Sequence, residues 1–181
     1  MSDAPLTAVT RLEAFVGTDL EDLCDAAEAA IKADGGFGWL RIPPRHIMES
    51  YWRGALLVPE RQVFVARLDR TICGSVQLAR PPRNNEAQAF AAQLTANFIA
   101  PWARGHGLAR RLVVAVEDAA RAAGFAILNL DVRESQTAAI QLYESLGFEC
   151  WGTHPAYARV NGEIIRGHFY YKRLAPTEAP R

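Results

Sequence analysis

The chain has 181 residues, half of them apolar and about a fifth charged, and its formal net charge is zero. This length and balance are typical of one folded domain with a sizeable core and exclude a disordered chain. A neutral chain gives no support to nucleic-acid or anionic-membrane binding, so an anion site would need a local cluster of groups.

Neither a membrane span nor a leader sequence is expected. The longest apolar runs, such as residues 112–116, are far shorter than the roughly 20 residues of a spanning helix. The first residues lack the basic and apolar regions of a secretory signal. The three cysteines are widely spaced and show no metal-binding pattern. We therefore expect a reduced cytoplasmic protein without a metal site, with cysteines that act as small buried side chains.

The first 79 residues are expected to form strands and two helices. Residues 7–16 alternate loosely and favour a strand, and a helix capped by Thr18 or Asp19 runs to about Asp34, before the glycines of residues 35–38. The apolar side chains expected on its inner face are Leu20, Leu23, Ala27 and Ile31. A second helix follows Pro43–Pro44 and stops near Gly54. Residues 61–79 predict two strands around a turn at Asp69–Arg70.

The middle of the chain predicts a loop, a strand and a helix. Residues 81–86 are polar and predict a loop. Residues 88–99 fit helix or strand by pattern, and we expect mostly strand. A helix is expected from Leu108 to about Ala123, closed by Gly124. Its inward residues are expected to be Leu108, Leu112, Ala115, Val116 and Ala119.

The last third predicts a strand, a helix and a final hairpin. Residues 125–132 predict a buried strand, and residues 135–146 a helix ended by Gly147. Two strands, residues 148–160 and 164–174, flank a turn at Asn161–Gly162. Residues 1–174 are expected to form one α/β domain, and residues 175–181 a frayed tail.

The segment PWARGHGLARRLV, residues 101–113, has the chemistry of an anion site at a helix start. The first turn of a helix leaves backbone N–H groups unpaired and carries partial positive charge, so it favours phosphate. Gly105 and Gly107 allow close approach and unusual backbone angles, and Arg104 adds a full charge. The segment lacks the Lys-[Ser/Thr] ending of a nucleotide-triphosphate loop and the third glycine of a dinucleotide fold. Taken alone, this pattern also fits an ordinary glycine turn before a helix.

A second motif narrows the interpretation. After the strand LNLDV, the segment RESQTAAIQLYESLGFE places Tyr143 late in a helix. Together with FIAPWARGHGLARRLV, it closely resembles the GNAT superfamily of acyl-coenzyme A-dependent N-acyltransferases over residues 60–173. The resemblance implies a mixed α/β fold, with a mostly antiparallel sheet, a splayed pair of parallel strands and flanking helices. It also implies a bulged strand immediately before residue 100, which is the main reason to expect strand over 88–99.

The resemblance implies acetyl-coenzyme A as acyl donor and assigns most of its site. The family pattern for the pyrophosphate matches Arg104, Gly107 and Ala109, and the backbone N–H groups from Arg104 to Ala109 would hold that group. This loop and its borders make up the implied cofactor-binding set: Phe98, Ile99, Ala100, Arg104, Gly105, His106, Gly107, Leu108, Ala109 and Arg110. Ile99 and Ala100 would pair with the pantetheine arm, and Arg110 or Arg111 would reach the adenosine phosphate or remain a solvated helix face.

Tyr143 and Gln136 complete the implied set. Tyr143 matches the tyrosine that protonates the departing thiolate in many relatives, which the ordinary pKa values of a thiol and a phenol make feasible. Many relatives carry asparagine where this chain has Gln136. The longer amide would contact coenzyme A or the neighbouring backbone differently, or not at all.

The implied reaction is direct attack of a primary amine on the thioester, with a backbone N–H near Ile99 or Ala100 steadying the oxyanion. A base must take the ammonium proton. The candidates are Glu86, His154, Tyr157 and His168, and for each a surface or hydrogen-bonding role is favoured. Trp39, Tyr51 and Trp52 would line the acceptor pocket or pack against the sheet.

The acceptor, a small-molecule or peptide amine, is not specified by the sequence. Dimers are common among similar proteins, so a homodimer is also compatible with the resemblance. The alternative function is a non-catalytic acyl-CoA-binding regulatory or sensor module.

Overall fold

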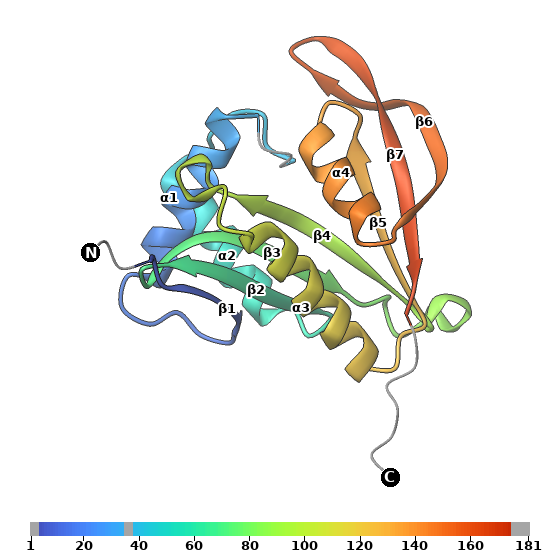
Figure 1. The fold of residues 1–181 in the computed structure, drawn as a ribbon, viewed down its shortest axis with the longest axis horizontal. Coiled ribbons are helices and arrows are strands. Elements are labelled where there is room, and N and C mark those ends of the chain that lie inside the picture. The colour runs from blue at the N-terminus through green and yellow to red at the C-terminus, as the bar shows by residue number, and fades with distance from the viewer. Residues whose placement is uncertain (1–3, 35–37, 175–181) are drawn as a thin grey trace.

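Seven strands form one mixed sheet in the computed structural model, which describes residues 4–34 and 38–174 (Figure 1). The strands are β1 (Thr7–Leu12), β2 (Arg61–Leu68), β3 (Thr71–Ala79), β4 (Ala91–Ile99), β5 (Ile127–Arg133), β6 (Glu149–Val160) and β7 (Glu163–Arg173). Their order in the sheet is β1-β2-β3-β4-β5-β7-β6. The β4–β5 pair is parallel and the other pairs are antiparallel. The fold class expected from the sequence is confirmed.

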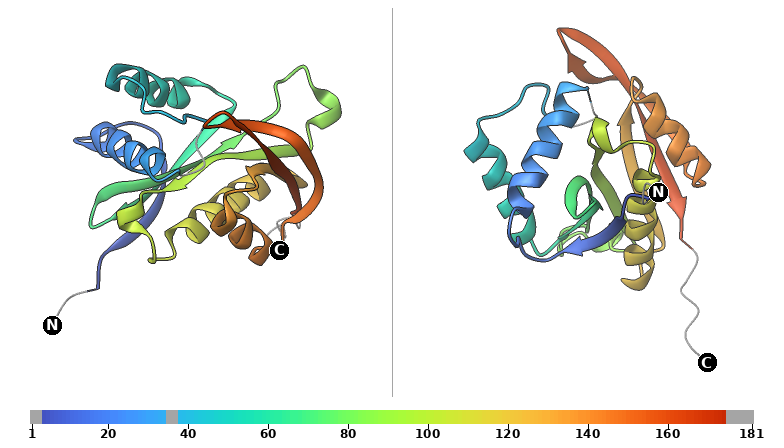
Figure 2. Two further views of the ribbon diagram at one scale, coloured as in Figure 1. Left: turned by 90° about the horizontal axis from the view of Figure 1, so that it is seen from above. Right: turned by 60° about the vertical axis from the view of Figure 1, so that its left-hand side comes forward.

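Four α-helices of the described chain cover the two faces of this sheet. They are α1 (Asp19–Lys32), α2 (Arg45–Leu57), α3 (Leu108–Ala122) and α4 (Thr137–Ser145), with short 3₁₀ turns at Glu86–Gln88 and Pro101–Ala103. The edge-on view shows α1 and α2 on one face and α3 and α4 on the other (Figure 2). None of the described helices is long and apolar enough to cross a membrane.

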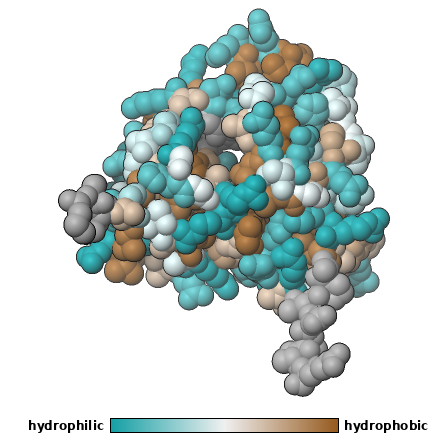
Figure 3. Space-filling view, viewed as in Figure 1, coloured by the Kyte–Doolittle hydropathy of each residue, from teal (hydrophilic) through white to brown (hydrophobic). Residues whose placement is uncertain are grey.

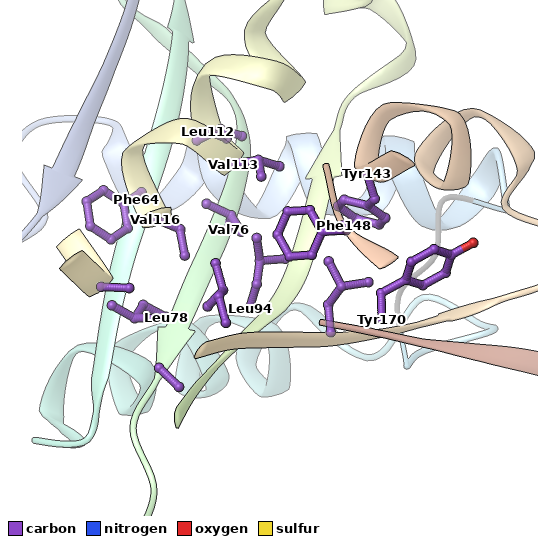
Figure 4. Packing of buried hydrophobic residues seen from close by; sticks show 14 of the residues in the cluster. Phe64, Val76, Leu78, Leu94, Leu112, Val113, Val116, Tyr143, Phe148 and Tyr170 are labelled. Atoms are coloured by element: carbon purple, nitrogen blue, oxygen red, sulfur yellow. The ribbon is translucent and has the colours of Figure 1, made fainter. Parts of the chain in front are cut away.

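Each helical layer closes a separate hydrophobic core. The α3–α4 side buries Leu112, Val116 and Phe148 against β-strand residues such as Val76 and Leu94, and Figure 4 shows this packing. The α1–α2 side buries another set, which includes Leu20, Leu23, Ala27, Ile31, Met48 and Trp52. The four residues expected on the inner face of the first helix are all in this second core. On α3, Leu108, Leu112 and Val116 are buried as expected, and Ala115 and Ala119 are partly buried.

Turns and helix ends follow the glycine and turn signals of the sequence. Asp69 and Arg70 both have positive φ (48° and 75°), as do Asn161 and Gly162, which is the pattern of a two-residue hairpin turn. At the end of α4, Gly147 has φ 85°, and the Phe148 N–H donates to the Tyr143 carbonyl at 3.1 Å. This is a Schellman cap, in which the left-handed residue after the helix lets the next N–H reach back to an open carbonyl.

Several expected boundaries differ from the structure. The second helix, expected to stop near Gly54, continues to Leu57. The first strand ends at Leu12 instead of residue 16, because its pairing with β2 stops there and the Val16 N–H turns to the Asp19 carboxylate. Gln88 lies in a 3₁₀ turn, so β4 begins at Ala91. The expected helix over 135–146 is shorter, Thr137–Ser145. The glycine stop expected at 35–38 and the expected tail at 175–181 lie wholly or largely outside the described residues.

The β4 strand carries the expected bulge. Its register against β3 passes from Gln77↔Thr95 to Ser75↔Phe98, so two residues of β4 stand opposite one of β3. Ala96, inside the bulge, has a left-handed φ of 51°, which is uncommon for a residue with a Cβ. Beyond the bulge, β4 lies so close to Gly74 of β3 that a Cβ there would meet the Phe98 carbonyl oxygen at 2.5 Å. Gly74 therefore sets how closely the bulged strand approaches its neighbour.

We expect Gly74→Ala to lower the free energy of unfolding by about 1–3 kcal/mol, the usual cost of forcing extra volume into packed structure. Gly54→Ala is the control, because nothing lies within 4 Å of its Cβ and alanine favours the helix interior. Urea unfolding of both variants measures the difference. Equal stability of Gly74→Ala and the wild type would contradict the close approach.

Candidate active site

A gap in the sheet opens between β4 and β5. The two strands pair only through Ala91–Gln93 and Ile127–Asn129, and beyond these residues they diverge (Figure 1). The second half of β4, which contains the bulge, therefore has an edge without a partner strand among the described residues. Such an edge leaves backbone groups available to a ligand that runs beside it.

The N–H groups of Ile99 and Ala100, at the end of β4, point toward opposite edges of the strand. Ile99 faces Gly74 in the register, with the Ala100 N–H donating to the Cys73 carbonyl at 2.8 Å. In this antiparallel arrangement the N–H of Ile99 points to the opposite edge, toward the gap. The Ala100 carbonyl also accepts from the Ala103 N–H at 2.9 Å. The Ala100 N–H is thus already used within the chain, and of the two residues Ile99 is left to present its N–H.

The glycine loop ends in an open helix start. Gly105 and Gly107 have φ of 87° and 70°, and no atom lies within 4 Å of a Cβ built on either. Gly107 is the N-cap of α3, and its carbonyl accepts the Arg111 N–H at 3.2 Å. No side chain caps the helix, so the N–H groups of the first turn remain open. The loop therefore has the backbone geometry that an anion needs.

Side chains around the loop differ in what they contact. Arg104 and His106 are exposed, and the Arg104 N–H makes a long bond of 3.4 Å to the Pro101 carbonyl. Leu108 is buried in the α3–α4 core, so only its backbone faces the loop. Phe98 is also buried, in the α1–α2 core, with its ring 6.2 Å from Trp52.

The two arginines of α3 extend in different directions. Arg110 donates to the Ser145 hydroxyl at 2.7 Å and so bridges α3 and α4. Arg111 donates to the Thr7 hydroxyl at 2.8 Å, on β1. Both side chains are exposed. Of the two, Arg110 lies on the side of the helix that faces α4.

Tyr143 is placed by α4 beside the bulge of β4. Its side chain is buried, its ring lies 5.8 Å from that of Phe148, and its hydroxyl accepts the Asn97 Nδ2–H at 3.0 Å. Burial raises the pKa of the Tyr143 phenol above its usual value near 10, and the bond from Asn97 acts in the opposite direction. The phenol is therefore fully protonated at neutral pH, as a proton donor must be.

Gln136 contacts the neighbouring backbone. It precedes α4, and its Nε2 donates to the Asp34 carbonyl at 2.7 Å, next to the end of α1. Asp34 also pairs with Arg133 at 3.4 Å. These contacts join the two helical layers across the gap. The longer amide of Gln136 thus contacts the neighbouring backbone at Asp34.

A cleft of about 750 Å³ lies where the gap meets the helices and the β6–β7 hairpin. Figure 3 shows a hollow near the centre of the molecule, with hydrophobic and hydrophilic residues around it. Tyr143, Asn97 and Gln136 line the cleft, and Trp39 and Tyr51 contribute aromatic rings. Trp52, the next residue along α2, is instead buried in the core at 1% exposure. Of the three aromatic residues expected near an acceptor, two therefore lie there.

Asp131 is the only carboxylate among the described residues that line this cleft. One of its oxygens accepts the Gln93 Nε2–H at 2.9 Å, and the other accepts the Tyr157 hydroxyl through a short hydrogen bond. Burial, followed by the bond to Asp131, raises the pKa of Tyr157. The Tyr157 ring covers Gly167 so closely that any Cβ there would overlap it. Asp131 is not among the site residues predicted from the sequence. The signal that could have indicated it is a single acidic residue in the otherwise largely apolar strand LNLDV.

Three of the four candidate bases from the sequence lie outside the cleft. Glu86 is exposed in the 3₁₀ turn before β4. His154 accepts the Ala156 N–H, and His168 bonds with the Thr153 hydroxyl. None of the three lines the cleft. Tyr157 does, with its hydroxyl bonded to Asp131.

Comparison with known proteins agrees with this geometry. Residues 24–148 match the sequence profile of the Acetyltransferase (GNAT) family. An uncharacterized N-acetyltransferase of Azospirillum brasilense is 65% identical over 128 residues, which are 71% of this chain and 76% of the relative.

Solved structures share the fold at low sequence identity. A putative acetyltransferase from Salmonella typhimurium, solved with its cofactor acetyl-CoA, superposes with a TM-score of 0.76 at 17% identity, over 97% of this chain and 98% of the other. A phosphinothricin acetyltransferase from Sinorhizobium meliloti, in complex with acetyl-CoA, gives 0.77 at 20% identity, over 95% and 94%.

The family profile spans more than half of the chain, and the Azospirillum relative is similar over more than two thirds of both proteins. With the splayed sheet, the open glycine loop and the buried tyrosine in their expected places, this chain belongs to the GNAT family of acetyltransferases.

Proposed function

We propose that the protein transfers the acetyl group of acetyl-CoA to a primary amine by direct attack, within one complex of both substrates. The observation that carries this proposal is the placement of a buried tyrosine hydroxyl and a carboxylate in one cleft, at the end of a sheet gap beside an open helix start. The cysteines of the protein are free, which fits a cytoplasmic enzyme. Cys24 and Cys73 are buried as expected, whereas Cys150 is exposed, contrary to the expectation.

The donor site would run from the glycine loop to the cleft. The open N–H groups of Leu108, Ala109 and Arg110 suit a pyrophosphate, because they combine hydrogen-bond donors with the positive end of the α3 dipole. Arg104, which is exposed beside them, adds a full charge. The Ile99 N–H at the gap would pair with the ligand beside β4 or bind the developing oxyanion.

Two side chains would move the protons that the transfer requires. Acetyl-CoA supplies a thioester that needs no enzyme nucleophile. An alkyl ammonium, with a pKa of roughly 10, must first lose a proton, and Asp131 would accept it. The leaving sulfur must gain a proton, and Tyr143 would donate it. Asp131 lies on β5 and Tyr143 on α4, so a different side chain would serve each of the two proton transfers.

The residues that line the cleft indicate the chemical class of the acceptor. They include one carboxylate, Asp131, two arginines, Arg133 and Arg159, and four aromatic rings, those of Trp39, Tyr51, Tyr143 and Tyr157. The carboxylate and the rings suit an amine with a cationic head and some apolar surface. We propose a small-molecule or peptide amine. Binding of acetyl-CoA without turnover would instead indicate a sensor module.

The loop is tested by binding. We expect Gly107→Glu to weaken coenzyme A binding at least about tenfold, since it adds negative charge and a side chain where the anion sits. The control is Gly124→Glu, which adds the same charge at a glycine of similar positive φ, at the opposite end of the same helix. Calorimetry measures binding, and thermal melting shows that both variants fold. Equal coenzyme A affinity in the two variants would refute the loop assignment.

The reaction is tested by turnover. With acetyl-CoA and a panel of amines, we expect the wild type to release free thiol and one amine to gain an acetyl group by mass spectrometry. Tyr143→Phe should lower kcat about 10²-fold across pH 7–9, where the raised pKa keeps the phenol protonated in the wild type. Tyr171→Phe, which removes an exposed hydroxyl bonded to Glu149, is the control. Unchanged transfer by Tyr143→Phe would exclude it as the proton donor.

The carboxylate is tested by removing its charge. We expect Asp131→Asn to reduce kcat/KM for the amine by about 10²–10⁴, because the amide cannot accept the ammonium proton. Asp118→Asn, on the exposed side of α3, should leave the rate unchanged. Rates are compared at saturating acetyl-CoA. A ratio near one between Asp131→Asn and the wild type would show that the proton leaves by another route.

A further inference from the structure

Asn97 connects the bulge of β4 to the tyrosine of α4. It lies directly after Ala96, whose left-handed backbone places two residues opposite one of β3. Its Nδ2 donates to the Tyr143 hydroxyl at 3.0 Å, across 46 positions of sequence. Both residues line the cleft. The Asn97–Tyr143 hydrogen bond therefore depends on the bulge at Ala96, which sets the position of Asn97.

This bond determines where the phenol hydrogen can go. A phenol oxygen can accept hydrogen bonds and can donate one hydrogen. Asn97 uses an accepting position of Tyr143. Among the described residues, no acceptor takes the Tyr143 hydrogen itself, so that hydrogen remains available for the cleft.

The other end of the same amide has no partner within the described chain. The Asn97 Oδ1 is buried and accepts no hydrogen bond there. A buried acceptor without a partner costs stability, and a leucine of similar size would not carry this cost. Asn97 is therefore a poor choice for stability alone, and such exceptions call for another explanation.

We propose that Asn97 is a positioning residue that directs the Tyr143 proton toward the leaving sulfur. This role rests on the proposed function, in which Tyr143 is the acid. As the carbon–sulfur bond breaks, the sulfur takes the electron pair and then the proton from the Tyr143 oxygen. The phenolate that is left keeps the hydrogen bond from Asn97 Nδ2 until water restores its proton.

The first test needs no turnover. Tyrosine labelled with ¹³C at Cζ is titrated by NMR, with Tyr143→Phe used to assign the signal. We expect Asn97→Leu to raise the pKa of Tyr143, because the lost donor had stabilised the phenolate. Asn97→Asp should raise it further, since a carboxylate accepts the phenol hydrogen and repels the phenolate. Thr95→Val, which changes another lining residue of the same strand, should leave the titration unchanged.

The second test is a double-mutant cycle on kcat. We expect Asn97→Leu to reduce kcat about tenfold in the wild-type background and less than about twofold in the Tyr143→Phe background, where no hydroxyl remains to be directed. Equal losses in both backgrounds, or no loss in the first, would overturn the proposal.

The two tests also separate this inference from the proposed function. If the wild type binds acetyl-CoA but acetylates no amine, the proposed function fails, and with it the direction of the proton toward a leaving sulfur. If transfer and the Tyr143→Phe loss are found but Asn97→Leu leaves the Tyr143 titration unchanged, the proposed function stands and the role of Asn97 is refuted.

Discussion

The short pairing between β4 and β5 is the constraint on which the rest of the site depends. Parallel strands normally continue side by side, and here their ladder extends over three residues of each strand. The bulge at Ala96 and the fixed approach at Gly74 hold β4 to β3 while it leaves β5. The divergence of β4 from β5 thus provides a free strand edge, a cleft and space for the buried side chain of Tyr143.

The site combines a scaffold of zero net charge with local polarity. The chain has no net charge, yet the α3 N-terminus offers open N–H groups and an exposed arginine, and the cleft offers a single carboxylate within the described chain. Arg133 and Arg159 line the same cleft as this carboxylate. The anion site at α3 is therefore built from backbone direction and one exposed side chain, and Asp131 is the group in the cleft that suits an ammonium.

Much of the fold could be predicted because its signals are local. Glycines after α3 and α4 and the two hairpin turns act through the backbone angles of single residues, which the sequence displays directly. Tyr143 and the glycine loop were found through a family pattern. Asp131 was not, since its meaning depends on which strand lies beside it: in an isolated strand it is one polar residue, and only the gap places it in the cleft. Asn97 depends similarly on Ala96, because alanine gives no sign of a left-handed conformation.

The Schellman cap of α4 has a consequence for local stability. The carbonyl that receives the Phe148 N–H belongs to Tyr143, so the backbone of this residue closes the helix while its hydroxyl contacts β4. Fraying of the last turn, which costs little in most helices, would here move the phenol itself. The residue is held at both ends, and amide exchange at Phe148 reports directly on how long the phenol stays in place.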